Sequence, residues 1–302
     1  MKLYIEFYTI LHLIIFQFKT IFPYWIAGVF IGSLLSVFAT EKINTTLAGI
    51  NGEKYSIFWS LTAAMLGVAS PICMYGTIPL IASLGRKGVP QYILATFMIS
   101  SILLNPNLLF LSFSLGVPLA LTRLLSSILA GILAGLFVKI FFKRKTLFRY
   151  EDFEEKKKPR IDNIRLIHLL KDLNKSINIT APYFLFGILI TALFDRYFPK
   201  DWIVSLFGAN KGLGVLFASS LGVPLYVCGG GTIPIVKSWL EAGMSPGSAT
   251  AFMLSGPATK LTNLSAVKII LGAKNYVLYI TFNILYSIIV GFIVDVLFWS
   301  FK

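Results

Sequence analysis

Two cysteines, Cys73 and Cys228, are the residues of this chain whose type and spacing most readily indicate chemistry. They lie 155 residues apart, and each stands three residues before the same run, Gly-Thr-Ile-Pro. Cysteines at this separation give neither a disulfide framework nor the spacing of a zinc site. A thiolate is a soft ligand suited to copper(I), zinc or trivalent arsenic. A cysteine in apolar sequence often serves only as a small buried hydrophobe, but its recurrence at equivalent positions favours a binding role.

The cysteines belong to a longer internal repeat. Residues 67–100 and 222–255 align without a gap, and twelve of the 34 aligned positions are identical, which is too many for chance. Met98 and Met253 recur in the same way and would add thioether sulfur, although methionine more often fills gaps between helices. A duplicated segment broken by glycine and proline inside apolar sequence is typical of transporters whose substrate site lies between two repeats.

The composition predicts that this repeat lies in a membrane. Of the 302 residues, 56% are hydrophobic and 13% are charged, whereas an average soluble domain has about 25% charged residues. Apolar blocks long enough to cross the hydrocarbon core recur from end to end. We therefore expect an all-α integral membrane protein with about eight, and up to ten, transmembrane helices in two internal repeats.

Two of these apolar blocks, residues 56–85 and 212–240, are longer than a bilayer requires and carry glycine and proline in the middle. We predict discontinuous helices there, with second breaks in blocks 90–115 and 245–271. Non-helical backbone at bilayer depth is tolerated only where it is buried in protein or lines a polar cavity. The breaks therefore favour a binding site, and the alternative is a kink that merely allows close packing.

The breaks contribute candidate binding groups: backbone N–H and C=O groups, threonine hydroxyls and the ends of half-helices. Lys260 would be an ionisable residue at bilayer depth, which is a functional candidate by default, although it could instead reach the interface. Its counterpart in the first half is Asn105. The expected substrate-binding residues are Cys73, Gly76, Thr77, Pro79, Asn105, Cys228, Gly230, Gly231, Thr232, Pro234, Thr259, Lys260 and Asn263. No metal centre is expected, but Cys73, Cys228, Met98 and Met253 are possible soft ligands.

The sequence contains no recognisable enzyme motif. It lacks a nucleophile elbow, a Walker A glycine loop and a His-Glu-x-x-His motif, so we expect neither catalysis nor a cofactor. The net charge of +14 would indicate nucleic acid in a soluble protein, but here much of it lies in loops between apolar blocks. The expected partners are therefore the lipid bilayer and a small-molecule or ion substrate, without nucleic acid, and a homo-oligomer stays open.

The domain organisation follows from the repeat and from one long hydrophilic stretch. We predict a first transmembrane repeat at 1–142 with an N-terminal amphipathic helix, a basic cytoplasmic linker at 143–165, and a second repeat at 166–302. An even number of spans per half would place both termini in the cytoplasm, make the repeats parallel, and leave Arg123 outside. If the broken segments are re-entrant hairpins, each half has five spans and the repeats are inverted.

One motif pair resembles a known family. Residues 224–234, which read Pro-Leu-Tyr-Val-Cys-Gly-Gly-Gly-Thr-Ile-Pro, are followed by Ala-Phe-Met-Leu-Ser-Gly-Pro-Ala-Thr at 251–259, and the first half has Pro-x-Cys near Gly-x-x-Pro. This pattern resembles the predicted-permease family that includes the ArsP organoarsenical efflux permeases. The resemblance implies about eight spans, a prokaryotic inner (plasma) membrane and export, and it matches Cys73 and Cys228 to the family's cysteines. Members often carry Cys-Ser-Cys-Gly in the first half, whereas this chain has Met74 and Tyr75 between Cys73 and Gly76.

The functional hypothesis is a secondary-active permease that exports a small soft or thiophilic solute, such as a trivalent organoarsenical, through a central site between the repeats. In this hypothesis Lys260 biases the site toward anions or sets a proton linkage. The alternatives are zinc or copper efflux, a small-anion permease or channel, and, in another class, a membrane docking subunit that transports nothing.

Overall fold

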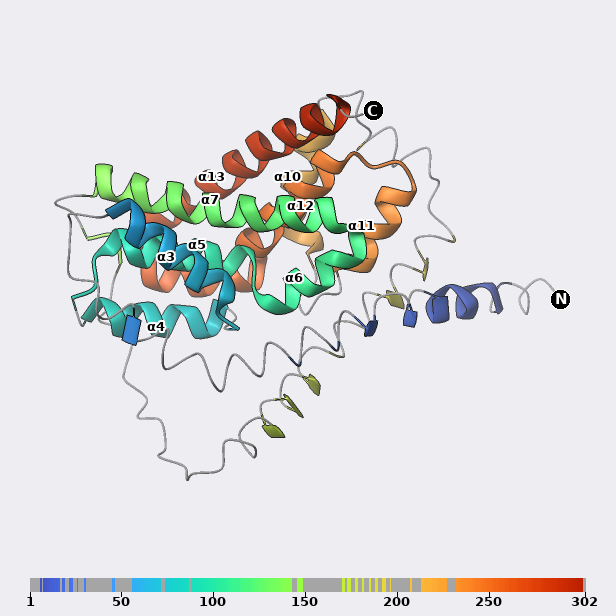
Figure 1. Cartoon of the computed structure of the whole chain (residues 1–302), viewed down its shortest axis with the longest axis horizontal. Helices are drawn as coiled ribbons and strands as arrows, with labels where there is room; N and C mark the ends of the chain where they lie inside the picture. Colours follow the sequence, from blue (N-terminus) through green and yellow to red (C-terminus); the bar gives the residue numbers. More distant parts are fainter. Residues whose placement is uncertain are drawn as a thin grey trace.

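The structure is a computed structural model, and it describes residues 56–71, 74–86, 88–142, 146–148, 213–226 and 232–300, with scattered positions within 6–46 and 170–207. These residues contain no strand. The helices are α3 (Ser56–Ala69), α4 (Met74–Arg86), α5 (Gln91–Leu103), α6 (Pro106–Ser112), the 3-10 turn η1 (Phe113–Leu115), α7 (Val117–Phe141), α10 (Leu213–Leu225), α11 (Thr232–Glu241), α12 (Pro246–Thr259) and α13 (Leu261–Ser300). The expected all-α class is confirmed (Figure 1).

Two helical segments are long and apolar enough to cross a bilayer: α7, with 25 residues, and the 28 residues of α13 from Ile270 to Leu297. A third candidate is α5 together with α6 and η1, which bend by 42° at their break. One face of α7 carries a leucine every four residues, and these side chains are 40% to 66% exposed, as contact with lipid requires: Leu121, Leu125, Leu129 and Leu133. The chain is thus a membrane protein, and the full count of eight to ten spans stays a prediction.

The expected helix breaks are present in both halves. α3 stops at Ala69 before α4 starts at Met74, and α10 stops at Leu225 before α11 starts at Thr232. The second breaks are shorter: Leu104 and Asn105 separate α5 from α6, and Lys260 alone separates α12 from α13. Discontinuous helices are therefore confirmed at all four predicted places.

The breaks are narrower than predicted, because residues 76–79 and 232–234 are helical. Gly76 and Pro79 lie inside α4, and Pro234 is the third residue of α11. A proline in the first turn costs little, since the N–H group that it lacks has no helical partner there. The expectation that the two runs present bare backbone groups is therefore wrong for residues 76–79 and 232–234. At these two breaks, only the residues before each helix remain candidates for free backbone groups.

Backbone geometry repeats between the halves. Among the described residues, four glycines have a positive φ, and they form two pairs: Gly88 (86°) with Gly243 (108°), and Gly116 (107°) with Gly272 (70°). The first pair is 155 residues apart and the second 156. Each pair marks the same junction, before α5 and α12 and before the last long helix of each half. The internal repeat therefore extends from the sequence to the backbone conformation.

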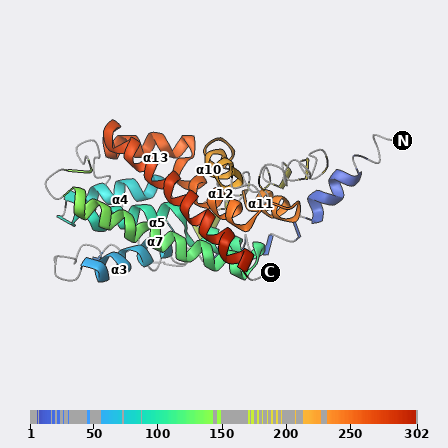
Figure 2. The same cartoon turned by 90° about the horizontal axis from the view of Figure 1, so that it is seen from above.

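Equivalent helices of the two halves run in opposite directions. In the contact between α7 and α13, the Tyr286 hydroxyl donates to the Ser126 carbonyl at 2.6 Å, and Asn275 donates to the Leu147 carbonyl, just past α7, at 2.9 Å. Residue numbers therefore increase along α7 in the direction in which they decrease along α13. In both views the end of α13 lies toward the same side of the molecule as the beginning of α7 (Figures 1 and 2). A rotation axis along the membrane normal would keep equivalent helices parallel, so the parallel arrangement is wrong and the inverted alternative holds for this pair.

Small residues bring the helices of each half close together. A Cβ atom on Gly131 would lie 2.9 Å from the Thr96 carbonyl oxygen, and one on Gly135 would lie 2.9 Å from that of Tyr92. These glycines let α7 cross α5 at short distance. In the second half, a Cβ on Gly291 of α13 would similarly lie 2.9 Å from the Gly247 carbonyl of α12. Both halves thus use glycine to pack equivalent helix pairs.

Candidate functional site

An arginine, Arg123, lies two turns into α7 and is the largest of the fully buried side chains that the structure describes. α7 begins directly after Gly116, and Pro118 stands in its first turn, so the helix register is set close to the break before it. The exposed leucine stripe occupies one side of the helix and Arg123 the other, with 0% of its surface exposed. The helix therefore aims a guanidinium group into the protein interior.

The guanidinium contacts three elements. Its Nη1 donates to the Ser112 hydroxyl on α6 at 2.8 Å. Its Nη2 lies 3.5 Å from the Tyr226 hydroxyl and 3.5 Å from the Met253 carbonyl oxygen of α12. The Nε atom has no hydrogen-bond partner among the described residues. Residues of both halves therefore meet at this one cation.

Tyr226 connects this cluster to a predicted break. It is the first residue after α10, in the segment that leads to Cys228, and only 7% of it is exposed. Its ring packs on Phe252, with centroids 6.3 Å apart, and against Gly256, where a Cβ would lie 2.7 Å from the Tyr226 Cγ. The start of the α10–α11 break is therefore held firmly beside Arg123.

No carboxylate balances this charge within the described part of the chain. The ion pair that the structure records there joins Arg196 to Glu6, and no acidic side chain lies within ion-pair distance of Arg123. The three contacting groups are neutral acceptors. They solvate the guanidinium in part, but they leave a net positive charge in a buried place.

The two cysteines and the glycines beside the second one lie outside the described residues: Cys73, Cys228, Gly230 and Gly231. Their role as soft ligands therefore stays a prediction. The same holds for the side chains of Pro79 and Asn263, which lie within α4 and α13. Gly76 is likewise placed in α4 by its backbone alone.

Most of the other predicted residues form hydrogen bonds within their own helices. Asn105 caps α6, and its Oδ1 accepts the Leu108 N–H at 2.9 Å. The Thr259 hydroxyl donates to the Ser255 carbonyl one turn earlier, at 2.7 Å. Thr77 instead faces another helix, because its hydroxyl lies 3.4 Å from that of Ser101 on α5. These contacts are compatible with a structural role and do not assemble a solute site by themselves.

Three further predicted residues lie at the ends of α11 and α12. Thr232 and Pro234 are buried in the first turn of α11. Lys260 is partly exposed and follows the last residue of α12, where its N–H donates to the Gly256 carbonyl at 3.0 Å. A helix break is therefore present at Lys260, and its depth in the bilayer stays a prediction.

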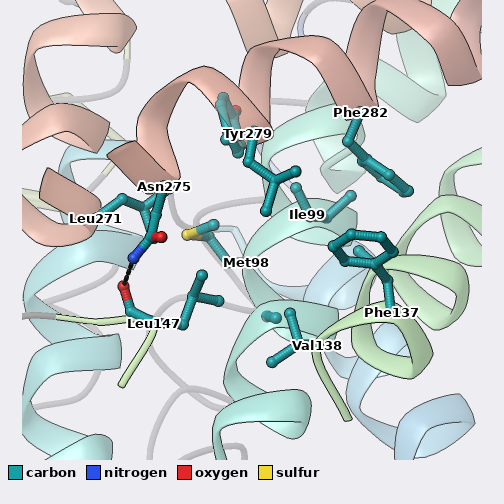
Figure 3. A pocket seen from close by; sticks show the side chains of 12 residues that line it. Met98, Ile99, Phe137, Val138, Leu147, Leu271, Asn275, Tyr279 and Phe282 are labelled. Carbon is teal, nitrogen blue, oxygen red and sulfur yellow. Dashed lines mark hydrogen bonds between the residues drawn. The ribbon is translucent and has the colours of Figure 1, made fainter. Parts of the chain in front are cut away.

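The predicted methionines differ in their surroundings. Met98 lines a pocket of about 50 Å³ between α5, α7 and α13. The side chains labelled in Figure 3 are largely apolar, and the two polar groups among them are already bonded: Asn275 to the Leu147 carbonyl and Tyr279 to the Ala258 carbonyl. Met253 is 1% exposed, and its carbonyl rather than its sulfur is recorded beside Arg123. The surroundings of Met98 fit packing better than solute binding.

Sequence reasoning missed Arg123 as a site residue. The even span count suggested only that it lies on the outer side of the membrane, and its burial was not expected. A signal was nevertheless present, because Arg123 stands in a continuous apolar span, where charged side chains are expensive and usually functional.

A family model described as a predicted permease, ArsP_1, matches residues 6–296. A UPF0718 protein of Methanocaldococcus jannaschii is 26% identical over 121 residues, which are 40% of this chain and 33% of that protein. A second UPF0718 protein, from Bacillus subtilis, is 30% identical over 76 residues, 25% of this chain and 26% of the relative. These two matches thus span about a third and a quarter of the relatives.

A longer match is to a Streptococcus mutans protein whose name describes it as a proposed subunit of a two-component membrane permease complex. It is 25% identical over 277 residues, 87% of this chain and 90% of that protein. No solved structure matches the chain significantly.

Proposed function

Because this chain belongs to the predicted-permease family ArsP_1, we propose that it is a secondary-active permease whose solute passes between its two halves. The observation that carries this route is the meeting of residues from α6, α7, α12 and the α10–α11 break around Arg123. Broken helices at the junction of inverted repeats are the usual location of transporter binding sites. Rocking of one half against the other would open the site to each side in turn.

We propose further that the solute is small and soft, and that it is exported. Cys73 and Cys228 precede α4 and α11 at equivalent sequence positions, and a pair of thiolates suits a trivalent organoarsenical. The repeat in the sequence and the resemblance to organoarsenical efflux permeases support this choice.

A sensitivity screen of a deletion strain tests this function. The strain is exposed to trivalent methylarsenicals, zinc, copper and oxyanions, and is then complemented with wild type, Cys73→Ser or Cys228→Ser at equal membrane levels. We expect arsenical sensitivity that wild type reverses and neither cysteine variant reverses. Met65→Leu is the matched control, because this sulfur-bearing side chain is 56% exposed on α3.

Other outcomes of the screen contradict the soft-solute choice. Sensitivity to zinc or copper that depends on the same cysteines means metal efflux instead. If the strain shows no sensitivity, and the purified protein moves no solute and copurifies with a second chain, the protein is a docking subunit.

We also propose a placement in the plasma membrane of a prokaryote, with the basic linker 143–165 in the cytoplasm between repeats 1–142 and 166–302. Inverted repeats imply an odd number of spans per half, so both termini would lie on the face opposite the linker. This reverses the cytoplasmic termini expected from an even count. A C-terminal alkaline phosphatase fusion is expected to be active, and a fluorescent C-terminal green fluorescent protein fusion would contradict the placement.

A further inference from the structure

Arg123 carries a buried positive charge. The charge of a guanidinium is delocalised over a planar group with five N–H donors. A charge moved out of water is destabilising unless an opposite charge and good hydrogen bonds offset it. Among the described residues Arg123 has hydrogen-bond acceptors but no opposite charge. The protein therefore maintains a site where an anion would be strongly favoured.

One edge of the Arg123 guanidinium lacks short hydrogen bonds. Nη1 makes the single short bond, to Ser112 at 2.8 Å. The Nε–H and an N–H of Nη2 point along the same side of the planar group, and together they form the edge that binds two oxygens of one ligand. On that edge, Nε has no partner among the described residues, and both contacts of Nη2 are at the long limit of 3.5 Å.

Ser112 is already oriented by its own bonds. Its hydroxyl donates to the Leu108 carbonyl at 2.6 Å, so it presents a lone pair to Nη1. This bond fixes the guanidinium from the side of α6. The Nε–Nη2 edge is therefore held in one orientation while its N–H groups still lack short hydrogen bonds. A group fixed in this way is preorganised to bind an anion.

We propose that Arg123 anchors an anion-binding site between the two halves, for a ligand with two acceptor oxygens on one atom: a carboxylate, a phosphate or another oxyanion. The proposal rests on the permease function and adds an anion-binding group to that route. It does not depend on the thiols. The phosphate group can belong to a free solute or to a lipid headgroup, and the two sources are separated by experiment.

The test measures anion-dependent thermal stability of the purified full-length protein. In phosphatidylcholine nanodiscs the chain is titrated with inorganic phosphate or acetate against chloride at constant ionic strength. A second arm replaces part of the phosphatidylcholine with phosphatidylglycerol and adds no free anion. We expect at least one anion to raise the melting temperature of wild type saturably. A rise in the phosphatidylglycerol arm alone supports the site and assigns it to a lipid headgroup.

Two variants of Arg123 and one control variant separate binding from folding. Arg123→Gln is expected to weaken the anion effect at least tenfold, whereas Lys268→Gln, which removes an exposed cation of α13, keeps it. Arg123→Met removes the buried charge together with its cost, so it should melt at or above wild type without anions and show no anion effect. A lower melting temperature of Arg123→Met without anions, together with an unchanged anion effect in Arg123→Gln, means that the arginine only braces the helices, and this overturns the proposal.

The wild-type titration decides the matter even if a variant fails to fold. If phosphate, acetate and phosphatidylglycerol all leave wild type unchanged, the site does not exist. If wild type binds an anion through Arg123 but proteoliposomes move no solute, the anion site stands and the permease function fails. If solute moves and Arg123→Gln moves it equally well, the permease stands and the proposed anchor fails.

Discussion

The contact between α5 and α7 makes a quantitative prediction for Gly135→Ala. The new Cβ would lie 2.9 Å from the Tyr92 carbonyl oxygen and would overlap the Thr96 hydroxyl, whereas ordinary contact begins at 3.4 Å. The two helices must therefore separate by about 0.5 Å, or the hydroxyl must turn away. Overpacking of this kind costs about 1–3 kcal/mol, and the better helix propensity of alanine returns about 1 kcal/mol. Because one of the two overlaps is with backbone, the upper half of the overpacking range applies, about 2–3 kcal/mol, and the net loss is about 1–2 kcal/mol.

Thermal melting of the purified protein, followed by the loss of the monodisperse peak, measures this loss as a fall of several degrees. Leu125→Ala is the control on the same helix, because Leu125 is 66% exposed on the leucine stripe and should change little. Thr96→Ala in the Gly135→Ala background removes the hydroxyl overlap but not the carbonyl contact, so it should restore only part of the stability. A Gly135→Ala protein as stable as wild type would refute the close approach of α5 and α7.

Three further changes test single contacts by the same melting assay or by denaturant unfolding. Asp295→Ala removes the carboxylate that accepts the Gly247 N–H at 2.7 Å and the Ser245 hydroxyl at 2.9 Å. Because these bonds cap the start of α12, the protein should lose about 1 kcal/mol of stability. An unchanged melting temperature would mean that water replaces the carboxylate. Tyr286→Phe removes the 2.6 Å hydrogen bond between α13 and α7 and should lower the stability by about 0.5–1.5 kcal/mol. Unchanged stability would argue against the antiparallel contact. Gly272→Ala places a Cβ at a φ of 70° and should cost about 1–3 kcal/mol, and a neutral result would contradict the kink inside α13.

The positions of the breaks could be read from the sequence because they depend on local chemistry. Glycine and proline weaken or remove helical hydrogen bonds wherever they stand, so all four interruptions were predicted. Their extent was predicted less well. Pro234 is the third residue of α11, in the first turn, where a proline costs little, whereas Pro79 is the sixth residue of α4 and lies inside the helix.

The relative direction of the halves could not be read from the sequence. An identical motif is compatible with either direction, and only a long-range contact such as that of Tyr286 with Ser126 distinguishes them. Counting the spans did not replace such a contact, because the sequence of a broken helix fits one span or two half-spans equally well.

The residues expected to bind the solute stay a prediction. Tyr226, beside the α10–α11 break, contacts Arg123, and the residues that recur in both halves drew attention away from this arginine. Arg123 has no charged counterpart in the second half at the 155-residue offset, where Leu278 stands. A search for repeated residues therefore favours what the halves share and misses a charge that only one half provides.

Transport by the purified chain tests the central claim most directly. Proteoliposomes are loaded with the solute identified by the sensitivity screen, an ion gradient is imposed, and movement of the solute against its own gradient is measured. The account predicts uphill movement by wild type and by Lys268→Gln, and its loss in Arg123→Gln protein that is still folded. Downhill flux that no ion gradient can reverse would mean a channel, and the absence of any flux would contradict the permease itself.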